Sequence, residues 1–244
     1  MEKHIKGLKT DLHLHTCDGI KDEYIRYDAF KLIDVAMQMG YEVLSITNHD
    51  TVTYNDYLKD YAYERGILLI PGIELTINRK HILVYNVPDP VNTLKDVRGI
   101  ERIKDSNNLF MAPHPFFPAG HSLGKLFVRW QHLFDAVELC HFYTDFINFN
   151  KKALDMAAKF NLPIVGTSDS HLLCQLNTTY SHIYAAAKDT DAVIEAVKKG
   201  AVEIVTSPLS LMRMGMIYNK VCLNYSMKKF GTTCFSLLSF LLRK

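Results

Sequence analysis

Short apolar runs alternate with amphipathic stretches along most of the chain. Runs of strand length lie at 8–15, 42–47, 67–75, 109–113, 136–142 and 162–168, and helical periodicity fills 27–40, 54–65, 125–134 and 145–160. A last helix and strand occupy 191–206, after which Ser207 and Pro208 offer an N-cap and a first-turn proline for a final helix. Strands that alternate with helices are typical of a parallel sheet with crossover helices. About seven such units in a chain of this length favour a closed α/β barrel over an open sheet.

No segment has the composition of a linker, so we expect one domain over 1–244, with a C-terminal helical extension from about residue 208. Hydrophobic residues make up 48% of the sequence, which is enough for a sizeable core. The net charge of +2 does not indicate strong nonspecific binding to nucleic acid.

The cysteines and the two ends of the chain suggest a cellular location. Five cysteines without a C-x-x-C pair indicate a reduced, cytoplasmic protein, and the N-terminus lacks the apolar core of a signal peptide. The apolar run 234–244 is much shorter than the ~20 residues that span a bilayer, so we expect no membrane span. A terminal helix docked on the body is favoured over an anchor at a membrane surface.

Residues that can bind metal follow the predicted strands at their carboxyl ends, where α/β barrels carry their active sites. His13 and His15 share one face of the first strand because side chains alternate along a strand, so both imidazoles can bind one ion. Asp18 follows in the next loop, directly before Gly19, whose freedom at positive φ allows a sharp turn.

Glu74 lies inside the apolar run 67–75, where an unpaired carboxylate is costly, so it should form a salt bridge or bind metal. Its two oxygens could bridge two ions. His81 follows in a possible hairpin whose loop length decides its face. A loop of two or four residues ending at Lys80 would place His81 and Glu74 on one face, whereas three residues would separate them.

The remaining candidates each follow a further apolar run. His49 follows 42–47, His114 stands between two prolines after 109–112, and Asp169 and His171 follow 162–168. Taken singly, these positions also suit a helix cap or a rigid surface turn. Their collection at the ends of consecutive strands favours a metal site.

In this order the residues resemble the polymerase-and-histidinol-phosphatase (PHP) family, whose motifs are H-x-H followed by an acid, an H-D turn, a buried Glu, a His, an H-P and a D-x-H. The resemblance covers about 10–208 and implies a distorted (β/α)7, TIM-like barrel with two to three divalent ions, either Zn, Mn or Fe. The metal ligands that it implies are His13, His15, Asp18, His49, Glu74, His81, His114, Asp169 and His171, with Glu74, Asp169 and His171 as catalytic residues.

The resemblance also assigns these ligands to ions. One ion would take His13, His15, Glu74 and Asp169; a second would share Glu74 with His81 and His114; a third would use the first acid, His49 and His171. Many members carry that acid further from the H-x-H than Asp18 stands, which makes Asp22 an alternative. We favour Asp18, because Asp22 could instead begin the following helix. Many members also have an acid where Asn48 stands.

The implied activity is hydrolysis of a phosphate ester by metal-activated water. A nucleotide, an oligonucleotide or a small phosphorylated metabolite fits equally well, and a nucleic-acid end is a further candidate partner. Two alternatives are a metallohydrolase for a C–N or other non-phosphate bond and a non-catalytic PHP scaffold. The other histidines are expected to be solvated polar residues, although two of them could meet substrate; they are His4, His132 and His182, and His121 and His141 as the two exceptions.

Overall fold

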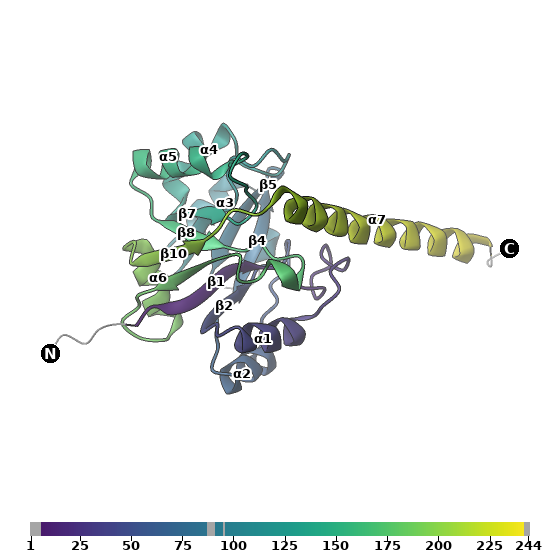
Figure 1. The fold of residues 1–244 in the computed structure, drawn as a ribbon, viewed down its shortest axis with the longest axis horizontal. Helices are drawn as coiled ribbons and strands as arrows, with labels where there is room; N and C mark the ends of the chain where they lie inside the picture. Colours follow the sequence, from purple (N-terminus) through teal and green to yellow (C-terminus); the bar gives the residue numbers. More distant parts are fainter. Residues whose placement is uncertain (1–5, 87–90, 95, 242–244) are drawn as a thin grey trace.

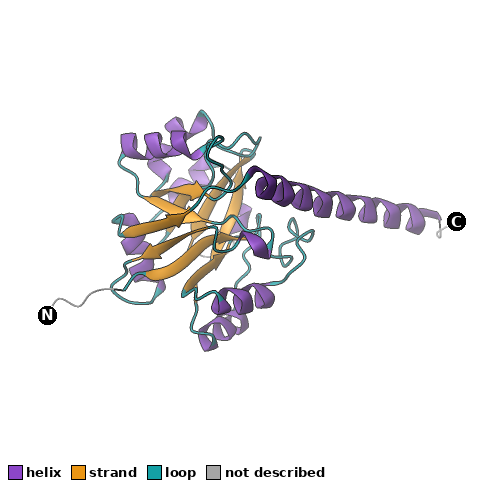
Figure 2. Cartoon of the chain, in the orientation of Figure 1, coloured by secondary structure: helices purple, strands orange, loops and turns teal. Residues whose placement is uncertain are grey.

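The computed structural model describes the backbone of residues 6–86, 91–94 and 96–241, and side chains up to residue 228. Strands form the centre of the molecule and helices surround them (Figures 1 and 2). One sheet has the order β10-β9-β1-β2-β3, with β1 Leu8–Leu14, β2 Val43–Ile46, β3 Leu68–Leu69, β9 Thr179–Ile183 and β10 Val202–Thr206. The other has the order β4-β5-β6-β7-β8, with β4 Gly72–Ile77, β5 Lys80–Tyr85, β6 Leu109–Ala112, β7 Ala136–Cys140 and β8 Ile164–Thr167.

Helices connect most of these strands. The α-helices are α1 Ala29–Gln38, α2 Asp56–Glu64, α3 Val97–Ile103, α4 Leu126–Trp130, α5 Asn150–Phe160, α6 Thr190–Lys198 and α7 Leu211–Leu241. Short 3-10 helices add η1 Val91–Thr93, η2 Gln131–Leu133 and η3 Leu173–Gln175. The predicted helix ends are confirmed for α1 and α2, because Gly40 and Gly66 follow them with φ of +76° and +69°.

The mixed α/β class is confirmed, but the all-parallel pairing is confirmed only in part. The pairs β1-β2, β2-β3, β6-β7 and β7-β8 are parallel, whereas β10-β9, β9-β1, β4-β5 and β5-β6 are antiparallel. Two isolated bridges, Leu14 to Ser170 and His49 to Glu74, join the two sheets near the predicted metal ligands. The distorted barrel itself stays a prediction.

The apolar pattern of 67–75 suggested a single strand, but the run is divided between two strands. Leu68–Leu69 pairs with β2 in one sheet, and Gly72–Ile77 pairs with β5 in the other. Pro71 lies at the break, and a proline has no backbone N–H to donate to a ladder. The chain therefore changes sheets at this proline, which places Glu74 opposite the end of β2.

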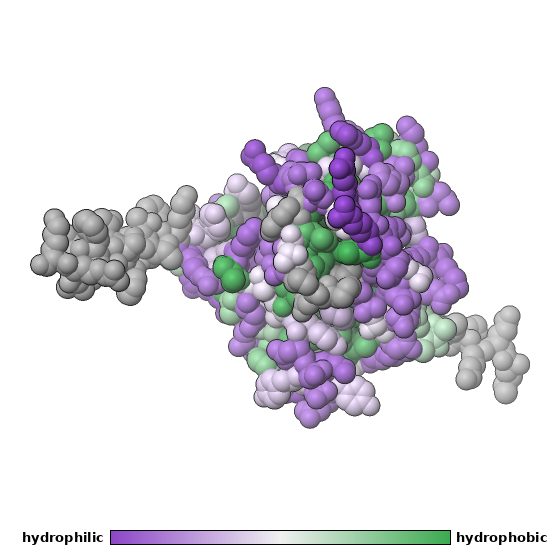
Figure 3. Space-filling model, turned by 180° about the vertical axis from the view of Figure 1, so that it is seen from behind, coloured by the Kyte–Doolittle hydropathy of each residue, from purple (hydrophilic) through white to green (hydrophobic). Residues whose placement is uncertain are grey.

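The core consists of apolar residues from both sheets and from the helices that cover them. Leu32, Ile33 and Ala36 of α1 are fully buried against a cluster that includes Leu14 and Ile46. Hydrophilic side chains cover much of the described surface seen from behind (Figure 3). The amphipathic pattern of the helices thus fixes which face each one turns to the strands.

Helix α7 begins differently from the prediction. The hydrogen bond to the first turn is accepted by Ser210 rather than Ser207, from Arg213 N to Ser210 Oγ (3.2 Å). Pro208 precedes the helix instead of occupying its first turn. The first turns of α7 lie against the body, and the rest of the helix projects away from it (Figure 1). The side chains of the run 234–244 lie outside the described residues. Among the described helices, none is long and apolar enough to cross a membrane.

Gly166 provides a test of this packing. A Cβ at Gly166 in β8 would lie 2.5 Å from Ile204 Cγ2 of β10, so Gly166→Ala should lower the free energy of unfolding by about 1–3 kcal/mol. Gly120, where an added Cβ meets nothing within 4 Å, is the matched control, and Gly120→Ala should change stability by less than about 0.5 kcal/mol. Urea unfolding of both variants measures the difference. Equal stabilities would show that β8 and β10 are less tightly packed than described.

Candidate metal centre

Four side chains converge where β1, β4 and β8 meet. The Nε2 atoms of His13 and His15 lie 3.1 Å apart, and each is 3.4 Å from Asp169 Oδ1. Glu74 Oε2 lies 3.5 Å from His13 Nε2 and 3.4 Å from His15 Nε2. Donors at ~2.0–2.2 Å from a tetrahedral ion are roughly 3.3–3.5 Å from one another, so the separations between the two imidazoles and each carboxylate oxygen suit shared coordination of one ion.

A second group surrounds the other oxygen of Glu74. His81 Nδ1 lies 2.7 Å and His114 Nε2 lies 3.1 Å from Glu74 Oε1. The β4-β5 register pairs Thr76 with His81, so His81 faces the same side as Glu74. The hairpin loop is the two-residue turn Asn78–Arg79, with both φ values positive, and it ends one residue earlier than the loops considered from sequence. Glu74 therefore has one oxygen in each group, as a bridging carboxylate would.

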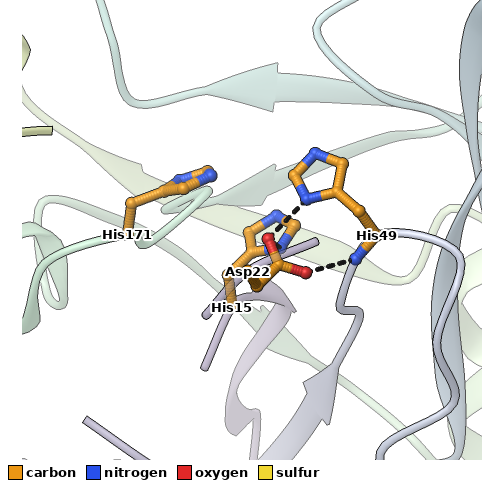
Figure 4. A group of neighbouring side chains, drawn as sticks. All are labelled: His15, Asp22, His49 and His171. Atoms are coloured by element: carbon orange, nitrogen blue, oxygen red, sulfur yellow. Dashed lines mark hydrogen bonds and ion pairs between the residues drawn. The ribbon is translucent and has the colours of Figure 1, made fainter. Parts of the chain in front are cut away.

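A third group contains His15, Asp22, His49 and His171, whose potential ligand atoms all lie within 4.8 Å of one another. Figure 4 shows the Asp22 carboxylate beside the rings of His15 and His49, with the ring of His171 in the same group. Asp22 Oδ1 lies 2.6 Å from His49 Nδ1 and 3.6 Å from His15 Nδ1, while His49 N donates to Asp22 Oδ2 (2.7 Å).

The preference for Asp18 over Asp22 is not supported by this geometry. Asp18 Oδ2 accepts a hydrogen bond from Ala29 N (2.8 Å) at the start of α1, whereas Asp22 is fully buried within the third group. The turn at Gly19 requires the small size of glycine and not the positive φ expected from the sequence. A Cβ at Gly19 would lie 2.7 Å from Asp22 Oδ2 and 2.8 Å from Asn48 Cβ. The missing side chain lets the loop bring Asp22 against the end of β2.

Glu138 is a functional candidate that the sequence reasoning missed. Its Oε1 lies 2.6 Å from His13 Nδ1 and also accepts from Thr167 Oγ1, while its Oε2 accepts from His114 N. A carboxylate on the far nitrogen of a metal-binding imidazole fixes the tautomer and the ring orientation. Like Glu74, Glu138 is an acid inside an apolar strand, and that signal could have found it.

Gln175 holds the loop that carries Asp169 and His171. Its Oε1 accepts from His171 N (3.0 Å) and Leu172 N (2.8 Å), which identifies Nε2 as the amide nitrogen. Nε2 then donates to Asp169 O (3.2 Å) and to His141 Nε2 (2.9 Å). Asp169 has a φ of +46°, a conformation that non-glycine residues seldom adopt, and these bonds help to hold it.

Burial and mutual attraction set the protonation of the group. Burial raises the pKa of Glu74, but the imidazoles of His81, His49 and His13 outweigh it and hold that pKa well below its ordinary value. Burial lowers the pKa of His49, yet Glu74 and the hydrogen bond that His49 donates to Asp22 raise it to about 9. Burial, together with His171 and His49 nearby, lowers the pKa of His15 to about 3. His15 is therefore a neutral imidazole, the form that binds metal.

The expectation of a solvated polar residue is confirmed for His132 and is wrong for His141. His132 is an exposed partner of Glu101, and His4 lies outside the described residues. His141 is 1% exposed and bonded to Gln175, with burial lowering its pKa to about 4. His121 stacks on His81 with ring centroids 4.4 Å apart.

Comparisons with known proteins show what parts of this chain resemble. A family described as PHP-associated matches residues 148–202. An uncharacterized protein of Methanocaldococcus jannaschii is 30% identical over 125 residues, which cover 48% of this chain and 73% of that protein.

Two solved structures share the fold. A two-domain protein of Bacteroides vulgatus, described as containing a predicted PHP-like metal-dependent phosphoesterase, aligns with a TM-score of 0.60 at 20% identity over 82% of this chain and 64% of that one. The lesion-specific endonuclease PfuEndoQ of Pyrococcus furiosus aligns with a TM-score of 0.56 at 15% identity over 81% of this chain and 57% of that one. The chain thus spans less than two thirds of each solved protein.

The two acids of the first loop give a direct test. Asp22→Asn removes the charge beside His15 and His49, so metal affinity should fall more than about 10-fold. Asp18→Asn should leave metal affinity unchanged, because asparagine keeps an oxygen for the Ala29 N–H. Competition with a chelator, read by metal analysis, measures both. If Asp18→Asn alone lowered the affinity, the acid beside these histidines would have been misassigned.

Glu138 offers a second test, of orientation rather than ligation. Glu138→Gln should weaken metal binding about 10–100-fold, because the amide cannot carry the charge that supports the His13 tautomer. Glu101→Gln is the control, since Glu101 is a half-exposed carboxylate that pairs with a histidine, His132, on the surface. Titration with Mn²⁺ or Zn²⁺ provides the measurement. Unchanged affinity in Glu138→Gln would remove its orienting role.

Proposed function

This chain belongs to the PHP-domain family, and from that premise we propose that it is a divalent-metal-dependent hydrolase that cleaves phosphate esters. One observation carries the proposal: the buried Nε2 atoms of His13 and His15, 3.1 Å apart, each lie 3.4–3.5 Å from an oxygen of Glu74 and an oxygen of Asp169. Buried histidines and carboxylates without cysteine suit zinc, manganese or iron. The donor set therefore fits the metals that the family implies.

The ligands divide among two to three ions as follows. We propose one ion on His13, His15, Glu74 and Asp169, a second on Glu74, His81 and His114, and a third on Asp22, His49 and His171, beside His15. When bound, such ions lower the pKa of water and neutralise charge on phosphate oxygens.

The residues of the chain have separate tasks in this proposal. Glu74 and Asp169 carry the negative charge that holds the ions, and Glu138 keeps His13 in the orientation that presents Nε2. His171 is partly exposed beside Asp169, so it can contact the phosphate ester from the open side of the centre. Glu74, Asp169 and His171 are thus the proposed catalytic residues.

The two alternatives account for less of the structure. A scaffold has no need for so many buried charged groups, which cost free energy unless they bind a ligand or each other. A hydrolase for C–N bonds could use the same donors, and product analysis distinguishes it. The likeness to an endonuclease supports a nucleotide or a nucleic-acid end among the possible substrates, beside small phosphorylated metabolites.

We also propose that 1–244 form one PHP-type domain in which the two sheets make the distorted barrel. The bridges Leu14 to Ser170 and His49 to Glu74 support this, because each joins a strand of one sheet to the segment that follows a strand of the other. Helix α7 is the C-terminal extension of that domain.

The function is tested by metal removal and reconstitution. Protein purified without chelator should contain two to three equivalents of transition metal, and it should release inorganic phosphate from a panel of phosphate esters. Chelation should abolish the activity, and Mn²⁺ or Zn²⁺ should restore it. His81→Ala should lower metal content and kcat/KM together by more than about 100-fold, since ligand loss exceeds the effect of an outer partner.

The matched control for that variant is His132→Ala, which removes an exposed histidine that pairs with Glu101. It should keep full metal content and activity. Release of ammonia or an amine in place of phosphate would support the C–N alternative. Less than one equivalent of metal, even after incubation with Mn²⁺, would contradict the metal centre itself.

A further inference from the structure

A cavity of about 210 Å³ lies directly beside the candidate metal centre. Asp169, His171 and His114 line one side of it. Helix α7 lines it too, through Ile217 and Val221 among others. The cavity therefore has a metal-binding side made by the strand ends and a wall contributed by the C-terminal helix.

The wall formed by α7 is held in place relative to the metal ligands. Arg213 Nη2 donates to Cys174 O (3.0 Å) in the loop after β8. The ring of Tyr225 packs edge-on against Tyr24 at 5.5 Å, and Tyr24 stacks on His171 at 6.1 Å. Helix α7 thus contacts the loop after β1 that carries Asp22 and the segment after β8 that carries His171.

The chemistry of the wall differs from that of the metal side. Tyr218 and Val221 of α7 face the cavity together with Phe117 and Phe142, so the space away from the ligands is mostly apolar and aromatic. A phosphate ester whose phosphate contacts His171 and the ion that Asp169 would hold would place its organic group in this space. Apolar surface attracts apolar groups and gives little to a polyol.

The size of the space suits a ring. An apolar cavity of about 150 Å³ accepts one benzene molecule, so the 210 Å³ here is sufficient for a planar aromatic group. Aromatic walls also favour offset or edge-on contact with such a group. A small, strongly hydrated alcohol would leave these contacts unmade.

We infer that α7 is the specificity element of the site, with Tyr218 and Val221 binding an aromatic ring of the phosphate ester, of the kind that a nucleobase or an aryl group provides. The inference rests on the proposed function and deepens it, because it names the class of organic group that the enzyme prefers. Selection of this ring is separate from the metal chemistry, since α7 contributes no member of the three groups of ligands described above.

A pair of phosphonates tests the inference without requiring turnover. Phenylphosphonate and methylphosphonate have the same anionic head, and their C–P bond is not a phosphate ester. On the manganese-loaded full chain, calorimetry should give phenylphosphonate an affinity about 10-fold or more above that of methylphosphonate, as burial of the ring predicts. Tyr218→Ala and Val221→Ser should each reduce that ratio several-fold while methylphosphonate binding stays the same.

The two substitutions differ in how strongly each is expected to destabilise the fold. Tyr218 is 61% exposed, so Tyr218→Ala should fold even if Val221→Ser disturbs α7. Met216→Ala is the control, because Met216 is 59% exposed on the same helix and does not line the cavity. It should keep the full preference. Circular dichroism checks that α7 persists in each variant.

The outcomes separate this inference from the proposed function. Equal affinity for both phosphonates in the unmodified protein, or a preference that survives in Tyr218→Ala and in folded Val221→Ser, would overturn the role of α7. Failure of both phosphonates to bind would also overturn it. A phenyl preference that depends on Tyr218, in a protein that hydrolyses no phosphate ester, would support the aromatic site and contradict the proposed function alone.

Discussion

The arrangement of the whole site depends on the burial of one carboxylate. Glu74 is 1% exposed, and five imidazoles lie within 3.5 Å of its two oxygens; they belong to His13, His15, His49, His81 and His114. An isolated buried carboxylate would cost several kcal/mol, so Glu74 requires these neighbours or metal ions. The imidazoles come from β1, β5 and the ends of β2 and β6. The need to satisfy Glu74 therefore couples the two sheets.

Strand ends alone would not hold the positions of the donor atoms accurately, because several of the residues that carry these atoms lie in loops. A second layer of hydrogen bonds supplies the missing rigidity. Glu138 joins His13 of the first sheet to the backbone of His114 in the second, and Gln175 ties Asp169 to His171. Both side chains are buried, so their hydrogen bonds have little competition from water. The ligands are thus held near the geometry that a metal requires.

The metal centre and the space beside it have different structural origins. Strands and their following loops provide the ligands, whereas α7 contributes to the wall of the adjoining cavity. Helix α7 contacts the site through Tyr24, whose ring lies between Tyr225 and His171, and through the hydrogen bond from Arg213 to Cys174 O. Because α7 supplies wall residues and no member of the three ligand groups, a substitution on α7 can alter the shape of the cavity without removing a donor atom.

Simple physical rules applied to the sequence predicted several residues of the site and part of the fold. The alternation of side chains on a strand placed His13 and His15 together, and the cost of a buried charge singled out Glu74. The same argument would have found Glu138, which stands in the apolar run of β7. The periodicity of apolar residues also gave the mixed α/β class and the ends of α1 and α2.

Other features were decided only by the tertiary structure. Strand periodicity does not say which neighbour a strand pairs with, so the antiparallel pairs of β9 and β5 could not be seen in it. The face of His81 depended on a two-residue hairpin, because one residue more would have turned it away. The choice between Asp18 and Asp22 depended on how closely Gly19 approaches Asn48. Sequence spacing fixes the distance along the chain between two acids, whereas the packing of the loop against β2 decides which of them reaches the histidines.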